Sequence, residues 1–186
     1  AEEKQESEQE VSIKVEIVDF PETKLLGSEF EYSPSTNRAK LHVPWYRLAQ
    51  NMYTMGPNMK AFFVDGQNTF LLIYNDLAKG SPFTDPTNVL RTGKIYTAVQ
   101  ASDKETKLPD SLSYRTIGPS RCLKVSSEAK PDITSSKKLN IGKIYETAII
   151  YLCKNHLVFD TSLEIQRDYR FDGRTVNKIE LYFVLK

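Results

Sequence analysis

The chain has few of the residue types on which most metal sites and many catalytic sites depend. Its 186 residues include two histidines, two cysteines and one tryptophan. His42 and His156 lie far apart in the sequence and have no paired carboxylate at ligand spacing, so we expect no metal site. We find no nucleophile elbow, phosphate-binding glycine loop or dinucleotide fingerprint, and we expect no cofactor. These absences count against the common hydrolase, nucleotide-binding and dehydrogenase classes.

Cysteine, charge and long apolar runs are also scarce. Cys122 and Cys153 are too few for a disulfide framework and lie in apolar runs, which favours a reducing, cytoplasmic setting. An exported or anchored protein is the alternative, because the sequence begins with alanine and not methionine. No apolar stretch approaches the roughly 20 residues of a membrane span. The net charge of +1 offers no field for a phosphate backbone, so we expect no direct nucleic-acid binding by this chain.

Composition divides the chain into a short tail and one domain. Residues 1–10 hold five glutamates and one lysine, which predicts a solvated, disordered tail or linker. Residues 11–186 form the expected domain, because the 40% hydrophobic content of the chain is enough for a sizeable core.

Hydrophobic periodicity predicts mainly strands with two helices. Apolar residues alternate over Val11–Ile17, and strands are also expected at Lys24–Tyr32, Thr69–Tyr74, Gly93–Val99, Leu112–Tyr114, Cys122–Val125, the run ending at Tyr169, and Ile179–Leu185. Helical spacing follows Pro44 up to Gly56 and recurs from Leu139 to about His156. The order of elements is similar in the two halves, so we expect an α+β fold of duplicated ββαββ-like halves. Such a fold has an antiparallel sheet, two main helices on one face and a central groove between them.

The last two strands carry the most informative side chains. Carboxylates, an amide and tyrosines alternate there with aliphatic residues, so each strand is expected to have one apolar face and one polar face that meets a ligand. This pattern indicates a binding pocket more than a bare scaffold.

Several short motifs, in their order and spacing, resemble a known family. They are Phe20–Gly27, Ile73–Asp76, Arg115–Pro119, Ile165–Tyr169 and Ile179–Val184. Over about residues 11–186 the chain resembles the gyrase-inhibitor-like (GyrI-like) effector-binding domain, which is found alone and in AraC-type and MerR-type multidrug-responsive regulators. The resemblance implies a central pocket for bulky, aromatic and often cationic compounds, held by aromatic rings around a buried carboxylate.

The resemblance also implies which residues line that pocket. Gln166 occupies the position of an acidic anchor on the penultimate strand, and an amide provides no countercharge. Asp168 or Glu164, which share its strand face, or Glu180 on the final strand are the candidates to replace the charge. The expected ligand-binding residues are Gln166, Glu180, Asp168, Tyr169, Tyr182, Trp45, Tyr74 and Tyr151. The alternative interpretation is that the carboxylates are solvated, the tyrosines are ordinary strand residues and Trp45 is a core anchor.

Three functions remain open. The leading hypothesis is a ligand-sensing or sequestering domain for a small aromatic or hydrophobic molecule, with any DNA-binding domain or partner protein outside this chain. The second is a small-molecule hydrolase of the same fold, with Glu180 and Tyr169 or Tyr182 as its acid–base residues. The third is an interaction or inhibitor module whose groove is filled by side chains.

Overall fold

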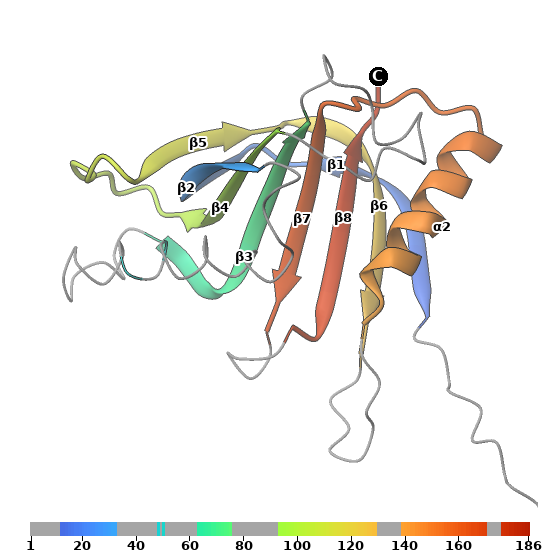
Figure 1. The fold of residues 1–186 in the computed structure, drawn as a ribbon, viewed down its shortest axis with the longest axis horizontal. Helices are drawn as coiled ribbons and strands as arrows, with labels where there is room; N and C mark the ends of the chain where they lie inside the picture. Colours follow the sequence, from blue (N-terminus) through green and yellow to red (C-terminus); the bar gives the residue numbers. More distant parts are fainter. Residues whose placement is uncertain are drawn as a thin grey trace, which may run out of the picture.

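A computed structural model describes residues 12–32, 48, 50, 63–75, 93–129, 139–170 and 176–186. Within these residues the chain forms one eight-stranded antiparallel sheet and the helix α2 (Ile141–Lys154), which confirms the α+β class (Figure 1). The acidic tail and most of the first expected helix lie outside the described residues, although Leu48 and Gln50 are helical. The strands are β1 (Ile13–Phe20), β2 (Thr23–Tyr32), β3 (Phe63–Asn75), β4 (Gly93–Ala101), β5 (Ser113–Ile117), β6 (Ser120–Glu128), β7 (Leu163–Tyr169) and β8 (Lys178–Val184).

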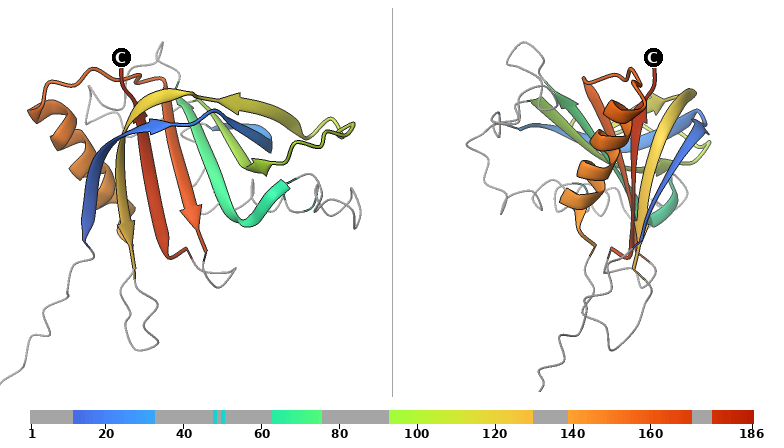
Figure 2. Two further views of the ribbon diagram at one scale, coloured as in Figure 1. Left: turned by 180° about the vertical axis from the view of Figure 1, so that it is seen from behind. Right: turned by 90° about the vertical axis from the view of Figure 1, so that its right-hand side faces the viewer.

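A long bent ribbon joins the two ends of the sheet. β1 pairs with β6 and β2 pairs with β5, with Phe20 opposite Ser120 and Thr23 opposite Ile117. The β1–β6 and β2–β5 pairs therefore share one register, although the ribbon is interrupted between β1 and β2 and between β5 and β6. Figure 2 shows this ribbon arching across the other strands. Because its two halves pair with opposite edges of the remaining strands, the ribbon forces the sheet to curl.

The order of the strands is symmetrical. It runs β1-β6-β8-β7-β3-β4-β2-β5, and it reads the same from the other end when each strand is exchanged for the one four places away in the chain. The centre of this order is the antiparallel pair of β3 and β7. Gene duplication of the two halves is compatible with this order and stays a prediction.

The concave face of the sheet holds the first hydrophobic core. All eight strands contribute to one cluster, which the curled sheet surrounds. Tyr96 and Phe70 are its largest fully buried side chains. The members of the cluster are Phe20, Leu25, Phe70, Leu72, Tyr96, Ala98, Ile117, Cys122, Ile165 and Tyr182.

On the opposite face, which we call the helix face, α2 packs against one half of the sheet. Asn140 caps this helix by accepting a hydrogen bond from the backbone N–H of Lys143 at 3.1 Å. Ile144, Ala148 and Leu152 recur at helical spacing and are buried against the sheet. Their partners include Leu123, Val125, Leu181 and Phe183. The predicted helix therefore has the expected apolar stripe.

A second cluster on the helix face lies in the other half of the sheet. Leu48 is buried there with Leu26, Val99, Ala101 and Leu112. A helical residue thus packs on β2 and β4 much as α2 packs on β6 and β8.

Strand boundaries differ most from the prediction in β3. This strand begins at Phe63 and not at Thr69. Its pairing with β4 shifts register between Phe63 and Asp65 and again before Thr69. Such irregularities interrupt the alternation from which strands are predicted, so the pattern revealed only the regular half.

Candidate functional site

The register of β7 and β8 divides the predicted site residues between the two faces of the sheet. Glu180 lies opposite Arg167, whereas Gln166 lies opposite Leu181. Directly opposite residues share a face, so Glu180 faces the concave side and Gln166 faces the helices. The expected ligand-binding residues of these two strands therefore do not all lie on one face of the sheet. The final strand has the expected apolar and polar faces, whereas the penultimate strand carries polar side chains on both of its faces.

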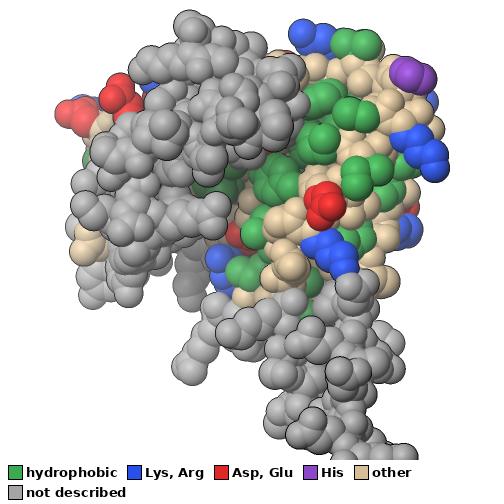
Figure 3. Space-filling model, turned by 45° about the vertical axis from the view of Figure 1, so that its right-hand side comes forward, with side chains coloured by type: hydrophobic (Ala, Val, Ile, Leu, Met, Phe, Trp, Pro, Cys, Tyr) green, Lys and Arg blue, Asp and Glu red, His purple; other side chains and the backbone are tan. Residues whose placement is uncertain are grey.

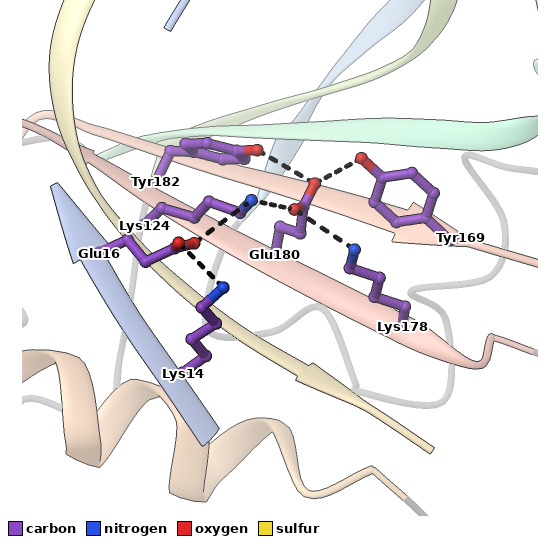
Figure 4. A network of polar contacts seen from close by, with 7 residues as sticks. All are labelled: Lys14, Glu16, Lys124, Tyr169, Lys178, Glu180 and Tyr182. Carbon is purple, nitrogen blue, oxygen red and sulfur yellow. Dashed lines mark hydrogen bonds and ion pairs between the residues drawn. The ribbon is translucent and has the colours of Figure 1, made fainter. Parts of the chain in front are cut away.

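Glu180 is the centre of a polar network on the concave face (Figure 4). This residue is buried, at 2% exposure, and one of its carboxylate oxygens accepts hydrogen bonds from the hydroxyls of Tyr169 and, at 3.0 Å, Tyr182. Lys124 Nζ lies 2.8 Å from the other oxygen, and Lys178 Nζ lies 3.9 Å from it. The structure thus brings together three predicted site residues, Glu180, Tyr169 and Tyr182.

The network fixes the charge of Glu180. Burial alone would raise the pKa of this carboxyl, but the hydrogen bonds from Lys124 and Tyr169 and the Lys124 charge outweigh it and lower the pKa below 4.5. Burial and the neighbouring Glu180 raise the pKa of the hydroxyls of Tyr169 and Tyr182. Glu180 is therefore a stable anion satisfied by its own chain, and neither tyrosine is prone to ionise.

The network continues to β1 through a second carboxylate. Lys124 Nζ also lies 3.7 Å from a carboxylate oxygen of Glu16, and Lys14 Nζ lies 3.0 Å from the other oxygen of Glu16. Lys124 was not among the predicted site residues. Its signal in the sequence is weak, because one lysine in an apolar run also fits a solvated strand position.

Gln166 and Asp168 form a smaller polar group on the helix face. The Gln166 side-chain amide donates a hydrogen bond to Asp168 Oδ1 at 2.9 Å. Asp168 is 7% exposed and lies opposite Thr69 of β3, in the central pair of strands. Burial raises the pKa of Asp168, and the bond from Gln166 and the charge of Arg170 oppose this shift only in part. An ionised Asp168 is therefore less well compensated than Glu180.

The other predicted residues occupy separate places. Glu164, on the helix face of β7, is 1% exposed and accepts a hydrogen bond from Asn75 Nδ2 at 2.7 Å. Tyr74 borders the concave core, with the Arg115 guanidinium 5.1 Å from its ring centre. Tyr151 lies on α2 and packs against the hydrophobic cluster between that helix and the sheet. Trp45 lies outside the described residues.

Arg167 is a further residue that sequence reasoning missed. Its guanidinium carbon lies 4.8 Å from the ring centres of both Phe70 and Tyr169. With Lys124 and Tyr182 it lines a pocket of about 240 Å³ at the bend between β1 and β2. The helix-period and strand-period patterns do not reveal this site, because its lining comes from strands far apart in the sequence.

The described residues include no cluster of His, Cys, Asp and Glu side chains that could hold a metal ion. In this part of the chain, no helix has the length and apolar content needed to cross a membrane. On the described part of the face seen in Figure 3, charged side chains of both signs lie among hydrophobic ones.

Neither a protein-family model nor a curated protein sequence matches this chain. Solved structures do match its fold. The crystal structure of the EcmrR C-terminal domain has a TM-score of 0.59 and 11% identity, covering 94% of this chain and 98% of that one. In a cryo-electron microscopy structure of an EcmrR–DNA complex, the match has a TM-score of 0.60 and 11% identity and covers 94% of this chain, which spans 57% of that longer chain.

Two further structures have the same fold. SAV2435 bound to tetraphenylphosphonium has a TM-score of 0.53 and 12% identity, over 93% of this chain and 94% of that one. A hydrolase encoded by lin2189 from Listeria innocua has a TM-score of 0.51 and 10% identity, over 93% and 92%. At these identities the likenesses show the fold alone, and it is the fold that the GyrI-like resemblance implies.

Proposed function

We propose that this chain is a small-molecule-binding domain that takes a bulky aromatic or hydrophobic compound on the helix face of its sheet. The observation that carries the proposal is the shared fold with SAV2435, whose structure contains tetraphenylphosphonium, a lipophilic cation with four aromatic rings. Gln166 and Asp168 lie on this face of β7, within the central β3–β7 pair of the sheet. A ligand there would lie between α2 and the helical residue Leu48.

Asp168 is our choice for the acidic group that faces a cationic ligand. Glu180 already has two lysines and two tyrosines around its carboxylate, so it has little to gain from another cation. Asp168 is almost as deeply buried but has a raised pKa, which means that its ionised form is poorly compensated in the free protein. A bound cation would supply the missing compensation in a region of low dielectric.

The two halves would contribute equally to such a site. The symmetrical strand order places β3 and β7 next to each other, and we infer that a duplicated ββαββ unit puts one helix on either side of them. The groove between the helices would then follow the pseudo-twofold axis. Tyr151 of α2 is the predicted aromatic residue that this arrangement places on the helix face.

Titration with tetraphenylphosphonium tests the proposal directly. Calorimetry should give saturable binding to the wild-type chain, and the neutral triphenylphosphine oxide should bind more weakly. Asp168→Asn should reduce the affinity for the cation by about tenfold, because one buried charge pair is lost. Glu16→Gln, which removes a partly exposed carboxylate on the concave face, is the control and should leave the affinity unchanged. Absence of binding, or equal losses in the two variants, would contradict the proposed site.

The hydrolase alternative has one observation in its favour. Glu180 bonds both tyrosines that the resemblance suggests as its partners, and a Listeria innocua hydrolase has this fold. The lowered pKa of Glu180 and the raised pKa of Tyr169 count against acid–base work near neutral pH. Turnover of an activated ester that disappears in Glu180→Gln would favour this alternative.

We propose further that binding is read out by another domain or by a partner protein. The support is the match to EcmrR, in which a chain of about this length is part of a longer protein seen in a complex with DNA. Ligand-dependent pull-down with a candidate DNA-binding partner would test this step. Ligand-independent association would instead favour an interaction module.

A further inference from the structure

A pocket lies on the concave face, on the opposite side of the sheet from the proposed helix-face site. Its volume is about 240 Å³, slightly below the roughly 300 Å³ at which pockets for drug-sized molecules begin. Its apolar walls are formed in part by Phe20 and Phe70, and its polar groups include Lys124, Arg167 and Gln100. Residues from β1, β2, β3, β4, β6, β7 and β8 meet there, so the pocket depends on the curl of the sheet.

Arg167 is the cation of this pocket that has no anionic partner in the described part of the chain. It lies opposite Glu180, yet the contacts of Glu180 are with two lysines and two tyrosines. Arg167 Nε is buried and has no hydrogen-bond partner among the described residues. The rings of Phe70 and Tyr169 hold the guanidinium in place, at 4.8 Å from each ring centre. The group is therefore oriented in advance and retains hydrogen-bonding capacity.

The surrounding charges favour an anion. Four cationic side chains, Lys14, Lys124, Lys178 and Arg167, lie in the Glu180 network or directly beside it, with the two carboxylates of Glu16 and Glu180. Four positive and two negative charges leave a surplus of two positive charges. Asp19, an exposed residue at the rim of the pocket, reduces the surplus without removing it.

We propose that this pocket is a second ligand site, which binds a small carboxylate by its anionic end on Arg167 and by its apolar body against Phe20 and Phe70. A guanidinium presents parallel N–H groups that match the two oxygens of a planar carboxylate. Lys124 adds a second positive charge to the lining of the pocket. The aromatic walls and the modest volume favour a single-ring compound over a larger one.

Benzoate is the probe for this site, with benzyl alcohol as a neutral compound of similar size. In isotope-edited NMR spectra of the full chain at constant ionic strength, the Arg167 Nε–H signal should shift on addition of benzoate and saturate at about millimolar concentration or below. The signal should not respond in this way to benzyl alcohol. A shift of similar size with chloride or with benzyl alcohol would overturn the proposal.

The matched control for Arg167 is Arg115, which also lies on the concave face with its guanidinium over two rings, 5.1 Å from Tyr74 and 4.1 Å from Tyr96, but lies outside the pocket. Arg167→Gln should weaken benzoate binding by about tenfold or more, since charge-assisted hydrogen bonds are lost. Arg115→Gln should change it less than about twofold. Equal weakening in the two variants would contradict the site. If Arg167→Gln fails to fold, the wild-type NMR titration still decides.

The two proposed sites are separable. Asp168→Asn should weaken tetraphenylphosphonium binding and leave benzoate binding unchanged, because Asp168 and Arg167 face opposite sides of the sheet. Loss of both ligands in this variant would indicate one shared site and contradict the second.

Discussion

Replacement of Glu180 by glutamine should destabilise the protein strongly at neutral pH. The glutamine keeps the size of the side chain but removes the charge that faces Lys124 at 2.8 Å and Lys178 at 3.9 Å. It also cannot accept hydrogen bonds at both of its terminal atoms, as the carboxylate does. The substitution therefore leaves a lysine without its buried partner and disturbs two tyrosine hydroxyls.

The magnitude follows from the burial of the two charged partners. Removal of one member of a buried ion pair costs about 3–5 kcal/mol. The Lys124 side chain is 22% exposed, whereas that of Glu180 is 3% exposed, so water and the more distant Glu16 partly compensate the lysine. We expect a loss of about 3 kcal/mol in the free energy of unfolding. At about 2–4 °C for each kcal/mol in a chain of this size, the melting temperature should fall by roughly 6–12 °C.

The loss should depend on pH in a defined direction. The pKa of Glu180 is lowered in the folded state, so its ionised form stabilises the protein fully above the ordinary value of 4.5. That contribution disappears as the pH falls through the lower folded-state pKa. The difference between wild type and Glu180→Gln should therefore be constant near neutral pH and shrink in strongly acidic solution.

Urea unfolding of both proteins, from about pH 7 down to about pH 3, measures this difference at each step. Glu16→Gln is the control, because the Glu16 side chain is 33% exposed and solvent screens its ion pairs, so its cost should be much smaller. A cost for Glu180→Gln below about 1 kcal/mol, or one that does not change with pH, would refute the role assigned to the network.

Three other substitutions have clear expected outcomes. Asp168→Asn should stabilise the free protein at neutral pH by about 1.4 kcal/mol for each unit by which burial raises the pKa of Asp168. Urea unfolding at several pH values should show that this gain in stability vanishes below pH 3.8. Gly27→Ala should cost about 1–3 kcal/mol in thermal unfolding, because the new Cβ would lie 2.2 Å from the carbonyl oxygen of Thr97. Ile144→Ala should cost about 2–5 kcal/mol, whereas Ile150→Ala, at a position 57% exposed, should stay within about 0.5 kcal/mol; similar costs would contradict the assigned face of α2.

Much of the fold could be predicted because its elements follow simple periods. The alternation of Ile13, Val15 and Ile17 gave β1, and the helical spacing of Ile144, Ala148 and Leu152 gave α2. Irregular segments were less predictable. In β3 the register shifts near Asp65 have no signature in hydrophobic periodicity, because they depend on the pairing with β4.

The candidate site was harder to predict, since its geometry depends on which residues lie opposite each other. The sequence indicated Glu180, Tyr169 and Tyr182 as candidate site residues, and hydrogen bonds join both hydroxyls to the carboxylate, while their role in binding stays a prediction. The sequence could not show that Gln166 and Glu180 face opposite sides of the sheet, because a shift of one residue in the pairing of β7 with β8 would put them on the same side. Arg167 went unnoticed for a related reason: a lone arginine in a strand acquires meaning only from the residues around it.

The two buried carboxylates on opposite faces of β7 and β8, those of Glu180 and Asp168, differ in how fully the folded chain compensates their charge. On the concave face Glu180 is saturated by its own lysines and tyrosines, and it is the neighbouring Arg167 that is left without an anionic partner among the described residues. On the helix face the Gln166 amide and the charge of Arg170 do not offset the burial of Asp168. A cation should therefore favour the helix face and an anion the concave face, because each binds where the folded chain leaves the opposite charge poorly compensated.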